Sequence, residues 1–228
     1  MKRTRRGQKT RAENNLGGRP QLIDTQKIVS AALELGVDNL SMHAVARKLG
    51  VSTTALYRYV ASKDVLLDEC MNYFCGKIEL PDDNLPWQTY MAGVGNAFRK
   101  ALITTPGASS YGVKIGPTTP AAFRIIEASL TVLQRDNFSP EQSWMAYSMV
   151  VDHVFNYVQK IEAFIELEAK NGPGGYKILQ LTESDLVDFP HIASALATYT
   201  GEVDFEESYQ TQIATIIAGI DAEFERRE

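Results

Sequence analysis

The chain has 228 residues, of which 44% are apolar, so it is long enough to bury a sizeable core. No apolar run approaches the roughly 18 residues of a membrane span, and the basic first segment lacks the apolar stretch of a secretory signal. Cys70 and Cys75 have neither CxxC spacing nor a histidine nearby in sequence, which argues against disulfide and zinc frameworks. We therefore expect a cytoplasmic globular protein whose cysteines are core residues.

The net charge of −5 combines two parts of opposite sign. Residues 1–65 contain 12 Lys and Arg against 5 Asp and Glu, a charge of +7, whereas residues 66–228 carry −12. A basic module on an acidic body attracts phosphate, which indicates nucleic acid as a partner. A disordered solubilising tail is the alternative, and it would account for residues 1–20 but not for the patterned segment after them.

The N-terminal part of the chain predicts an arm followed by helices. Residues 1–22 are rich in Lys, Arg, Gly and Asn, so we expect a flexible basic arm that orders only on DNA, if at all. Behind the N-cap Asp24, apolar residues recur at helical spacing until Gly36, which predicts a first helix. The N-cap Ser41 and the left-handed C-cap Gly50 bound a second helix.

Two more helices follow within the next 30 residues or so. A third begins at the N-cap Ser52 and ends in the region of Val60, with Ala55, Leu56 and Val60 facing inward. A fourth begins after Ser62 and ends before Pro81.

The remainder of the chain predicts helices and no strand. Their spans are 87–103, 120–135, 140–170, 189–198 and 205–226. The longest begins with a capping box, in which Ser139 is the N-cap and Gln142 the third residue after it. The Gly- and Pro-rich segments 104–120 and 171–175 are predicted to be loops.

The second and third helices, joined by a tight turn at Gly50 and Val51, have the pattern of a helix-turn-helix. In that motif the first helix braces across the phosphate backbone and the second presents side chains to base edges in the major groove. Thr53 and Thr54 are short enough for close approach, and Arg58 can donate two hydrogen bonds to guanine. An ordinary core hairpin with a solvated polar face is equally consistent with this pattern alone.

Residues 40–69, LSMHAVARKLGVSTTALYRYVASKDVLLDE, resemble the DNA-binding signature of the tetracycline repressor (TetR) family. The shared features are the LG turn, the LY pair at Leu56, the aromatic Tyr59 and the K-x-x-LL run from Lys63. The resemblance implies an all-α fold, with an N-terminal three-helix helix-turn-helix DNA-binding domain joined by a fourth helix to a larger ligand-binding and dimerisation domain. The implied domains are residues 1–22 (the basic arm), 23–68 (DNA binding) and 69–228 (ligand binding and dimerisation).

By position, the resemblance implies DNA contacts from Ser41, His43, Thr53, Thr54, Tyr57, Arg58, Tyr59 and Lys63. Arg19, in a Gly-Gly-Arg-Pro segment similar to the family's arm, would enter the minor groove, although a tail that never docks is an equal alternative. His43 is a departure, because arginine is common at that position and a neutral imidazole makes a weaker contact. The first helix also ends about one turn early.

Residues 87–226 resemble, more faintly, the drug-binding domain of the tetracycline repressors. Lys114 stands where that subgroup has a magnesium-ligating histidine, and Val94 and Ser129 replace drug-contacting amides, so we do not expect tetracycline to bind. We expect a mainly apolar pocket in which Lys114 favours a ligand with an anionic or carbonyl oxygen. The expected ligand-binding residues are Val94, Phe98, Lys114, Ile126, Ser129, Leu130 and His153. Core packing is the alternative for each of them.

Apolar stripes on the two longest C-terminal helices indicate a homodimer, since in the family the corresponding helices pair across a two-fold axis in a four-helix bundle. A monomer core is the alternative. The stripes are Trp144, Tyr147, Val151, Phe155, Val158 and Ile165 on one helix, and Tyr209, Ile213, Ile216, Ile217, Ile220 and Phe224 on the other.

These features predict a ligand-responsive transcriptional regulator: a repressor that binds palindromic operator DNA as a homodimer and is released by a small-molecule effector. An activator of the same architecture and a helical small-molecule enzyme are the alternatives. Asp152 and His153 suggest catalysis, but helix neighbours do not face each other and no nucleophile has a recognisable motif around it. We therefore expect no catalytic residue, no cofactor, no metal site and no membrane partner.

Overall fold

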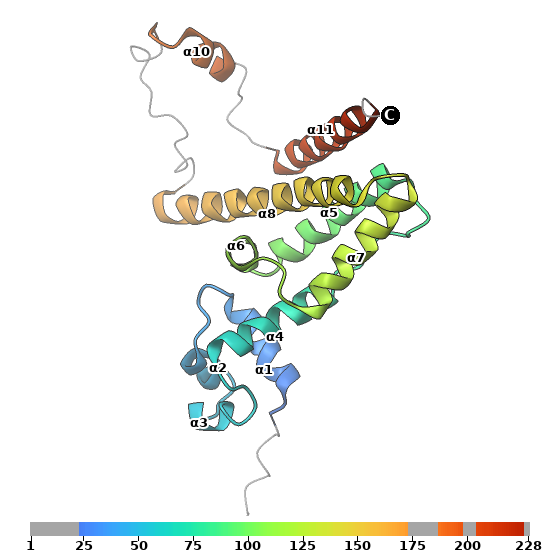
Figure 1. The fold of residues 1–228 in the computed structure, drawn as a ribbon. Helices are drawn as coiled ribbons and strands as arrows, with labels where there is room; N and C mark the ends of the chain where they lie inside the picture. The colour runs from blue at the N-terminus through green and yellow to red at the C-terminus, as the bar shows by residue number, and fades with distance from the viewer. Residues whose placement is uncertain (1–22, 173–186, 198–203, 226–228) are drawn as a thin grey trace, which may run out of the picture.

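The computed structural model describes residues 23–172, 187–197 and 204–225, and within these ranges the chain forms ten α-helices and no strand. The helices are α1 (Thr25–Leu35), α2 (Met42–Lys48), α3 (Thr53–Leu56), α4 (Lys63–Gly76), α5 (Trp87–Ile103), α6 (Ala108–Ile115), α7 (Pro120–Arg135), α8 (Pro140–Asn171), α10 (Pro190–Ala197) and α11 (Phe205–Glu225) (Figure 1). The predicted all-α fold is confirmed. The basic arm, with Arg19, lies outside the described residues.

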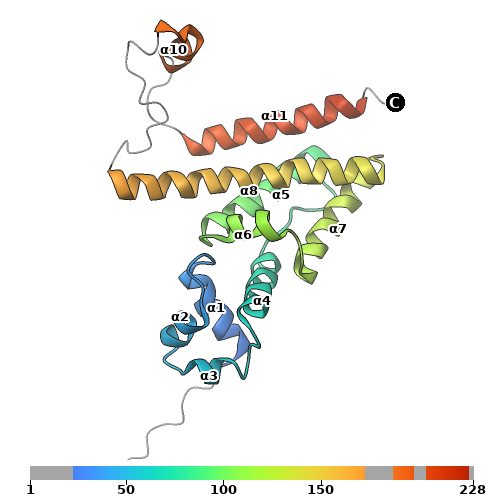
Figure 2. The ribbon, with the colours of Figure 1, turned by 60° about the vertical axis from the view of Figure 1, so that its left-hand side comes forward.

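The helices form two groups joined by α4. Figures 1 and 2 show α1, α2 and α3 together at one end of the molecule, while α8 and α11 run side by side at the other. Helix α4 leads from the first group, which we call the head, to the second, in which α5, α6 and α7 lie beneath α8. Helix α4 therefore connects the head to the larger group.

Side-chain caps begin the four N-terminal helices where the sequence predicts. Asp24, Ser41, Ser52 and Ser62 each accept a hydrogen bond from the backbone N–H three residues later, at 2.7–3.1 Å. Such a bond satisfies one of the donors that a helix start leaves free. Because these caps are local in sequence, the helix starts could be predicted without knowledge of the tertiary contacts.

The turn between α2 and α3 is closed by a left-handed glycine. Gly50 has φ 67°, and its N–H donates to the carbonyl of Arg47 at 3.2 Å, while the N–H of Val51 donates to Ala46 at 3.0 Å. This pair of bonds is the Schellman arrangement, which ends a helix and turns the chain sharply. The predicted helix-turn-helix connection is therefore present.

A compact apolar core holds the head together and continues into α4. Its most buried side chains are Ile28, Ala32, Leu40, Val45, Leu56, Val60 and Leu66. Leu56 and Val60 face inward as predicted, whereas Ala55 is only half-buried. After Leu56 the chain continues through hydrogen-bonded turns, so the α-helical part of α3 is a single turn.

The larger group is built around α5 and α8, which pack against each other and are covered by α11. Tyr209, Ile213 and Ile220 of α11 are almost fully buried within the chain. The sequence pattern favours a dimer interface for this stripe and its counterpart on α8, with a monomer core as the alternative. Most members of both stripes are already buried or half-buried within the chain, whereas Trp144 and Ile165 are exposed, at 51% and 59%. The dimer itself stays a prediction.

The predicted loop 104–120 contains the helix α6, which is a correction. Gly107, with φ 79°, precedes the helix and Gly116, with φ 77°, follows it, while Gly112 lies within it. A distant residue stabilises its start, because the Glu162 carboxylate of α8 accepts the Gly107 N–H at 3.0 Å and the hydroxyl of Ser109. A carboxylate at a helix N-terminus is also favoured by the helix dipole.

The other helix bounds agree closely with the prediction. Helices α5 and α7 match it to the residue, α8 extends one residue further, and its capping box is present. Helix α10 begins one residue later than predicted. Positions 198 and 226, the predicted ends of the last two helices, lie outside the described residues.

The head contacts the start of α6 through its α1–α2 connection. The N–H of Val37 donates to the carbonyl of Pro106 at 2.9 Å. At Gly107 an added Cβ would lie 2.8 Å from the backbone nitrogen of Asp38. The α6 end of the larger group is thus packed directly against the head.

Replacing Gly107 by alanine should destabilise the protein. The substitution places a side chain in a left-handed conformation and against the Asp38 backbone, so we expect a loss of about 1 to 3 kcal/mol in the free energy of unfolding. Urea denaturation followed by circular dichroism measures it. Gly76→Ala is the matched control, because no atom lies within 4 Å of its added Cβ. It should leave stability unchanged or raise it by up to about 1 kcal/mol; equal losses in both variants would contradict the contact.

Candidate nucleic-acid interface and ligand cavity

The predicted DNA-contacting residues of the head are mostly exposed. Ser41 and His43 are exposed at the start of α2, and Thr54 and Arg58 on and just after α3. Tyr57 and Tyr59 expose 51% and 43% of their surface, Lys63 is exposed at the start of α4, and Thr53 is half-buried. All eight belong to the end of the molecule farthest from α11 (Figure 1). Large aromatic side chains left in solvent are unusual and mark interaction surfaces.

Some of these side chains also have structural roles. The Ser41 hydroxyl oxygen accepts the Ala44 N–H as the cap of α2, which leaves its own proton available for an outside acceptor such as phosphate. Lys63 opens α4 behind the cap Ser62. The starts of α2 and α4 therefore fix where Ser41 and Lys63 lie.

Sequence reasoning missed Arg47, which is exposed on α2 one turn after His43. Its spacing of four residues from His43 was the available signal, because residues i and i+4 share a helix face. The adjacent Lys48 has a different environment, since its ammonium lies 3.0 Å from the carboxylate of Glu34 on α1. Arg47 thus adds a cation to the exposed face of α2 that carries His43.

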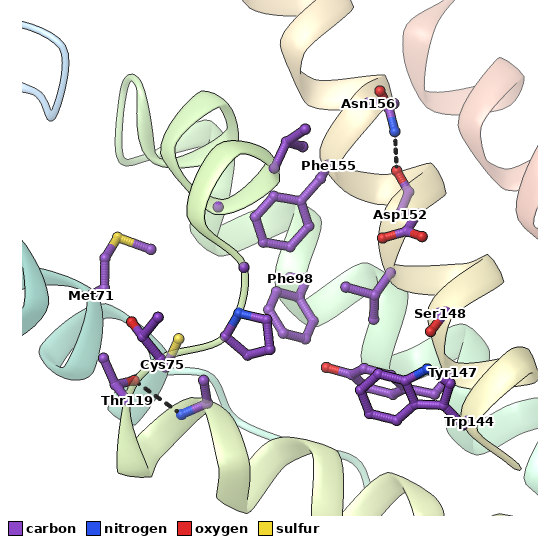
Figure 3. Close-up of a pocket in the computed structure, with 17 residues that line it drawn as sticks. Met71, Cys75, Phe98, Thr119, Trp144, Tyr147, Ser148, Asp152, Phe155 and Asn156 are labelled. Carbon is purple, nitrogen blue, oxygen red and sulfur yellow. Dashed lines mark hydrogen bonds between the residues drawn. The ribbon is translucent and has the colours of Figure 1, made fainter. Parts of the chain in front are cut away.

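A cavity of about 430 Å³ lies among α4, α5, α6, α7 and α8 (Figure 3). Its lining is mainly apolar and aromatic, with a few polar groups, as in pockets for drug-sized molecules. The lining residues are Met71, Cys75, Phe98, Gly112, Val113, Gly116, Pro117, Thr118, Thr119, Ala122, Trp144, Tyr147, Ser148, Val151, Asp152, Phe155 and Asn156.

Of the seven predicted ligand-binding residues, Phe98 lines this cavity and the other six lie outside its lining. Val94 and Ser129 are fully buried, Ile126 is buried and Leu130 is half-buried in the helix packing. The Val94 turn of α5 is covered from outside, since a Cβ on its neighbour Gly95 would meet side chains of both α8 and α11. These four residues therefore lie on helices that border the cavity, but not in its lining.

Lys114 and His153 also lie outside the lining. Lys114 is exposed on the last turn of α6. His153 stacks on Tyr209 of α11, with 6.2 Å between ring centroids, and its Nε2 is buried without a hydrogen-bond partner in the described part of the chain. Burial, followed by the charge of Lys160, lowers the pKa of His153 below its ordinary value. The ring is therefore held neutral in the core near α11.

Sequence reasoning missed most of the cavity's polar groups. Ser148, Asp152 and Asn156 follow one another at four-residue intervals on α8, which places them on one helix face. That spacing could be seen in the sequence, but the sequence did not show that α4 and α6 face these residues across a cavity. Met71 and Cys75, one turn apart on α4, form the wall nearest the head.

The cysteine thiols are buried and weakly acidic. Burial raises the pKa of Cys75 to about 11, and burial together with the charge of Glu69 raises that of Cys70 to about 12. Burial, with a contribution from Cys75 and Asp152, likewise raises the pKa of Tyr147. At neutral pH the thiols are therefore protonated, as expected for core cysteines.

Two connections tie the cavity walls to the head. The Asn72 side chain of α4 accepts the N–H of Ala121 at 3.1 Å, beside the lining residue Thr119 at the start of α7. Glu162 of α8 holds the start of α6, next to Pro106, which bonds to the head. The cavity walls on α4 and α6 are therefore connected to the head, through the chain of α4 and through the hydrogen bond between Val37 and Pro106.

Among the residues that the structure describes, no group of three or more His, Cys, Asp and Glu side chains could hold a metal ion. None of the described helices is both long and apolar enough to cross a membrane.

Thiol labelling tests the cavity wall. Because its pKa is raised by about two units, Cys75 should carry about 100-fold less thiolate at pH 8 than an unperturbed thiol, and should react correspondingly slowly with a disulfide reagent. Stopped-flow labelling of native and urea-unfolded protein measures the ratio. Cys75→Ser assigns the remaining rate to Cys70; native labelling at the unfolded rate would contradict the burial of both thiols.

Comparisons with known proteins agree with this architecture. Residues 28–70 match the family described as "Bacterial regulatory proteins, tetR family", and residues 80–224 match "Tetracyclin repressor-like, C-terminal domain". An HTH-type transcriptional regulator of Saccharopolyspora erythraea is 32% identical over 48% of this chain, a match that spans half of that relative. The class G tetracycline repressor of Vibrio anguillarum is 28% identical over 62% of this chain and 70% of its own.

Solved structures share the fold. Apo ActR of Streptomyces coelicolor superposes with a TM-score of 0.71 at 17% identity, covering 93% of this chain and 100% of that one. ActR in complex with actinorhodin gives a TM-score of 0.70 at 20% identity, over 88% and 96% of the two chains. The two domain matches together cover most of the head and most of the larger group, with a gap at residues 71–79 in α4 and the connection after it. The chain therefore belongs to the TetR family of transcriptional regulators, with a helix-turn-helix and a ligand-binding C-terminal domain.

Proposed function

We propose that this chain is a repressor that binds palindromic operator DNA in the cytoplasm as a homodimer and is released by a small-molecule effector. One observation carries the proposal: α4 begins at the exposed Lys63 of the head and continues into the cavity wall at Met71 and Cys75. One rigid helix thus belongs to both the DNA-facing surface and the ligand site. The names of the class G repressor and of the ActR–actinorhodin complex support repression and ligand binding.

The proposed DNA contacts divide by chemistry. Thr53, Thr54 and Arg58 would read base edges, while Tyr57, Tyr59 and Lys63 would contact phosphates on either side. Ser41 and His43, with Arg47, would brace α2 on the backbone, and Arg19 of the arm would enter the minor groove. The proposed division is a basic arm at 1–22, a DNA-binding domain at 23–68 and a ligand-binding and dimerisation domain at 69–228.

The homodimer follows from the need to read two half-sites and from apolar surface on α8. After α11 has covered its share, α8 still exposes Met145, Met149 and Leu167, which lie on one side of the helix. A two-fold axis beside α8 would bury these side chains in a self-complementary contact. The two copies of α3 would then lie about 34 Å apart, one helical turn of DNA.

Release from the operator would result from a shift between two states of the homodimer that differ in the distance between their two heads. An occupant of the cavity touches α4 directly and α6 and α7 at their cavity ends, and both routes lead to the head. A ligand that binds better to the spacing that does not fit DNA lowers operator affinity by its difference in affinity for the two states.

Selection of bound sequences from a random DNA pool tests the proposed function. We expect a palindrome whose half-site centres are about 10 base pairs apart, because the two reading helices enter successive major grooves. Sedimentation of the free protein should give a dimer. A pool that shows no enrichment, or a monomer that binds one half-site, would contradict the proposal, and a promoter assay with and without protein distinguishes repression from activation.

Arg58→Ala and Lys63→Ala should weaken DNA binding in different ways. Loss of a guanine contact should cost about 1 to 3 kcal/mol and relax specificity at one operator position. Loss of a phosphate contact should weaken all sequences alike and reduce the slope of log affinity against log salt by about 1. Fluorescence anisotropy on operator and random duplexes measures both.

Arg124→Ala removes the same charge from the exposed surface of α7 and serves as the control for Arg58. It should leave operator affinity and specificity unchanged. Equal losses on operator and random DNA for Arg58→Ala would refute its role in reading bases.

A further inference from the structure

Four aromatic rings form much of the cavity wall. Phe98 and Phe155 lie with ring centroids 5.7 Å apart, and Trp144 and Tyr147 with centroids 6.2 Å apart (Figure 3). Phe98 comes from α5 and the other three from α8, where Tyr147 is one turn after Trp144 and Phe155 about two turns after Tyr147. The faces of such rings are electronegative, so they attract cations as well as flat apolar ring systems.

A carboxylate lies among these rings. Asp152 is one turn before Asn156 on α8, and the Asn156 amide donates to the backbone carbonyl of Asp152 at 2.7 Å. That bond does not engage the carboxylate, and no hydrogen bond or ion pair to it occurs among the described residues. The charge of Asp152 contributes to the raised pKa of the lining residue Tyr147, which places its field inside the cavity.

No cation offsets this charge in the lining. The 17 lining residues include no Lys, Arg or His. Lys114 is exposed on α6, and Lys160 is two turns beyond Asp152 on α8, both outside the lining. The remaining polar groups are hydroxyls of Ser148, Thr118, Thr119 and Tyr147 and the Asn156 amide, all of them neutral.

We propose that the cavity binds an aromatic cation: a flat, apolar ring system bearing a protonated or quaternary nitrogen that pairs with Asp152 and packs against Phe98, Phe155, Trp144 and Tyr147. The inference names the effector class of the proposed regulator and rests on that function. An anionic ligand would meet an uncompensated carboxylate and the negative faces of the rings. The structure therefore reverses the expectation drawn from Lys114, whose ammonium is not part of the lining.

Three acridines of the same ring size and different charge test the proposal by titration calorimetry on the full chain. At pH 7, 9-aminoacridine is a cation, acridine is largely neutral and acridine-9-carboxylate carries a negative carboxylate. We expect 9-aminoacridine to bind about 10-fold more tightly than acridine, and the carboxylate to bind more weakly than acridine. A cavity of about 430 Å³ lies within the range of sites for molecules of this kind.

Two variants assign the preference to its residue. Asp152→Asn keeps the shape and removes the charge, so it should lower the affinity for 9-aminoacridine about 10-fold and leave acridine binding unchanged. Lys114→Gln is the matched control and should change neither. Circular dichroism melting checks that both variants fold.

The other outcomes overturn either the inference or the proposed function on which it rests. Tightest binding of acridine-9-carboxylate, abolished by Lys114→Gln, would establish an anion site instead. Equal binding of all three probes, or binding of none by a protein that still recognises its operator, would also refute a cation site. A preference for the cation in a protein that binds no DNA would instead refute the proposed function and leave the ligand class standing.

Discussion

Helix α4 is the element on which the rest of the structure depends, because its buried side chains belong to two cores at once. Leu66 and Cys70 pack into the head, where the Cys70 thiol lies 4.0 Å from the carbonyl of Val29 in α1. Met71 and Cys75, one turn further on, form the cavity wall. A 14-residue helix buried at both ends moves as a rod, since bending it would open one core or the other.

A half-buried carboxylate provides a second constraint of the same kind. Glu162 lies on α8 yet satisfies the start of α6, and the residue before that start bonds to the head. Without these hydrogen bonds the charged carboxylate would stay partly shielded from water and unpaired, which would lower the free energy of unfolding. Helix α6 therefore keeps its register on α8 while its other end, at Gly112 and Gly116, forms the cavity wall.

Local signals and distant contacts explain how far the sequence alone could predict this protein. Caps such as Ser52 and Ser139 act within four residues, so helix starts were predictable almost to the residue. Helix α6 was missed because Glu162, which stabilises its start, is more than 50 residues away. Apolar stripes indicate that a face is buried but not what buries it, which is why α11 was expected at an interface and lies in the core. The cavity needs five helices at once, so only Phe98 of its predicted residues lines it.

The position of the cavity sets what a ligand can do to the head. An effector that reduced operator affinity 100-fold would need to favour the released state by about 2.7 kcal/mol. Contacts with α8 alone cannot supply this difference, because α8 packs in the rigid core with α5 and α11. The difference must come from contacts with the walls that lead to the head: Met71 and Cys75 on α4, and the ends of α6 and α7. In the proposed regulator, the charge of Asp152 would hold the ligand in place and the apolar body of the ligand would contact Met71 and Cys75 on α4. Affinity and release would then depend on different parts of the same cavity.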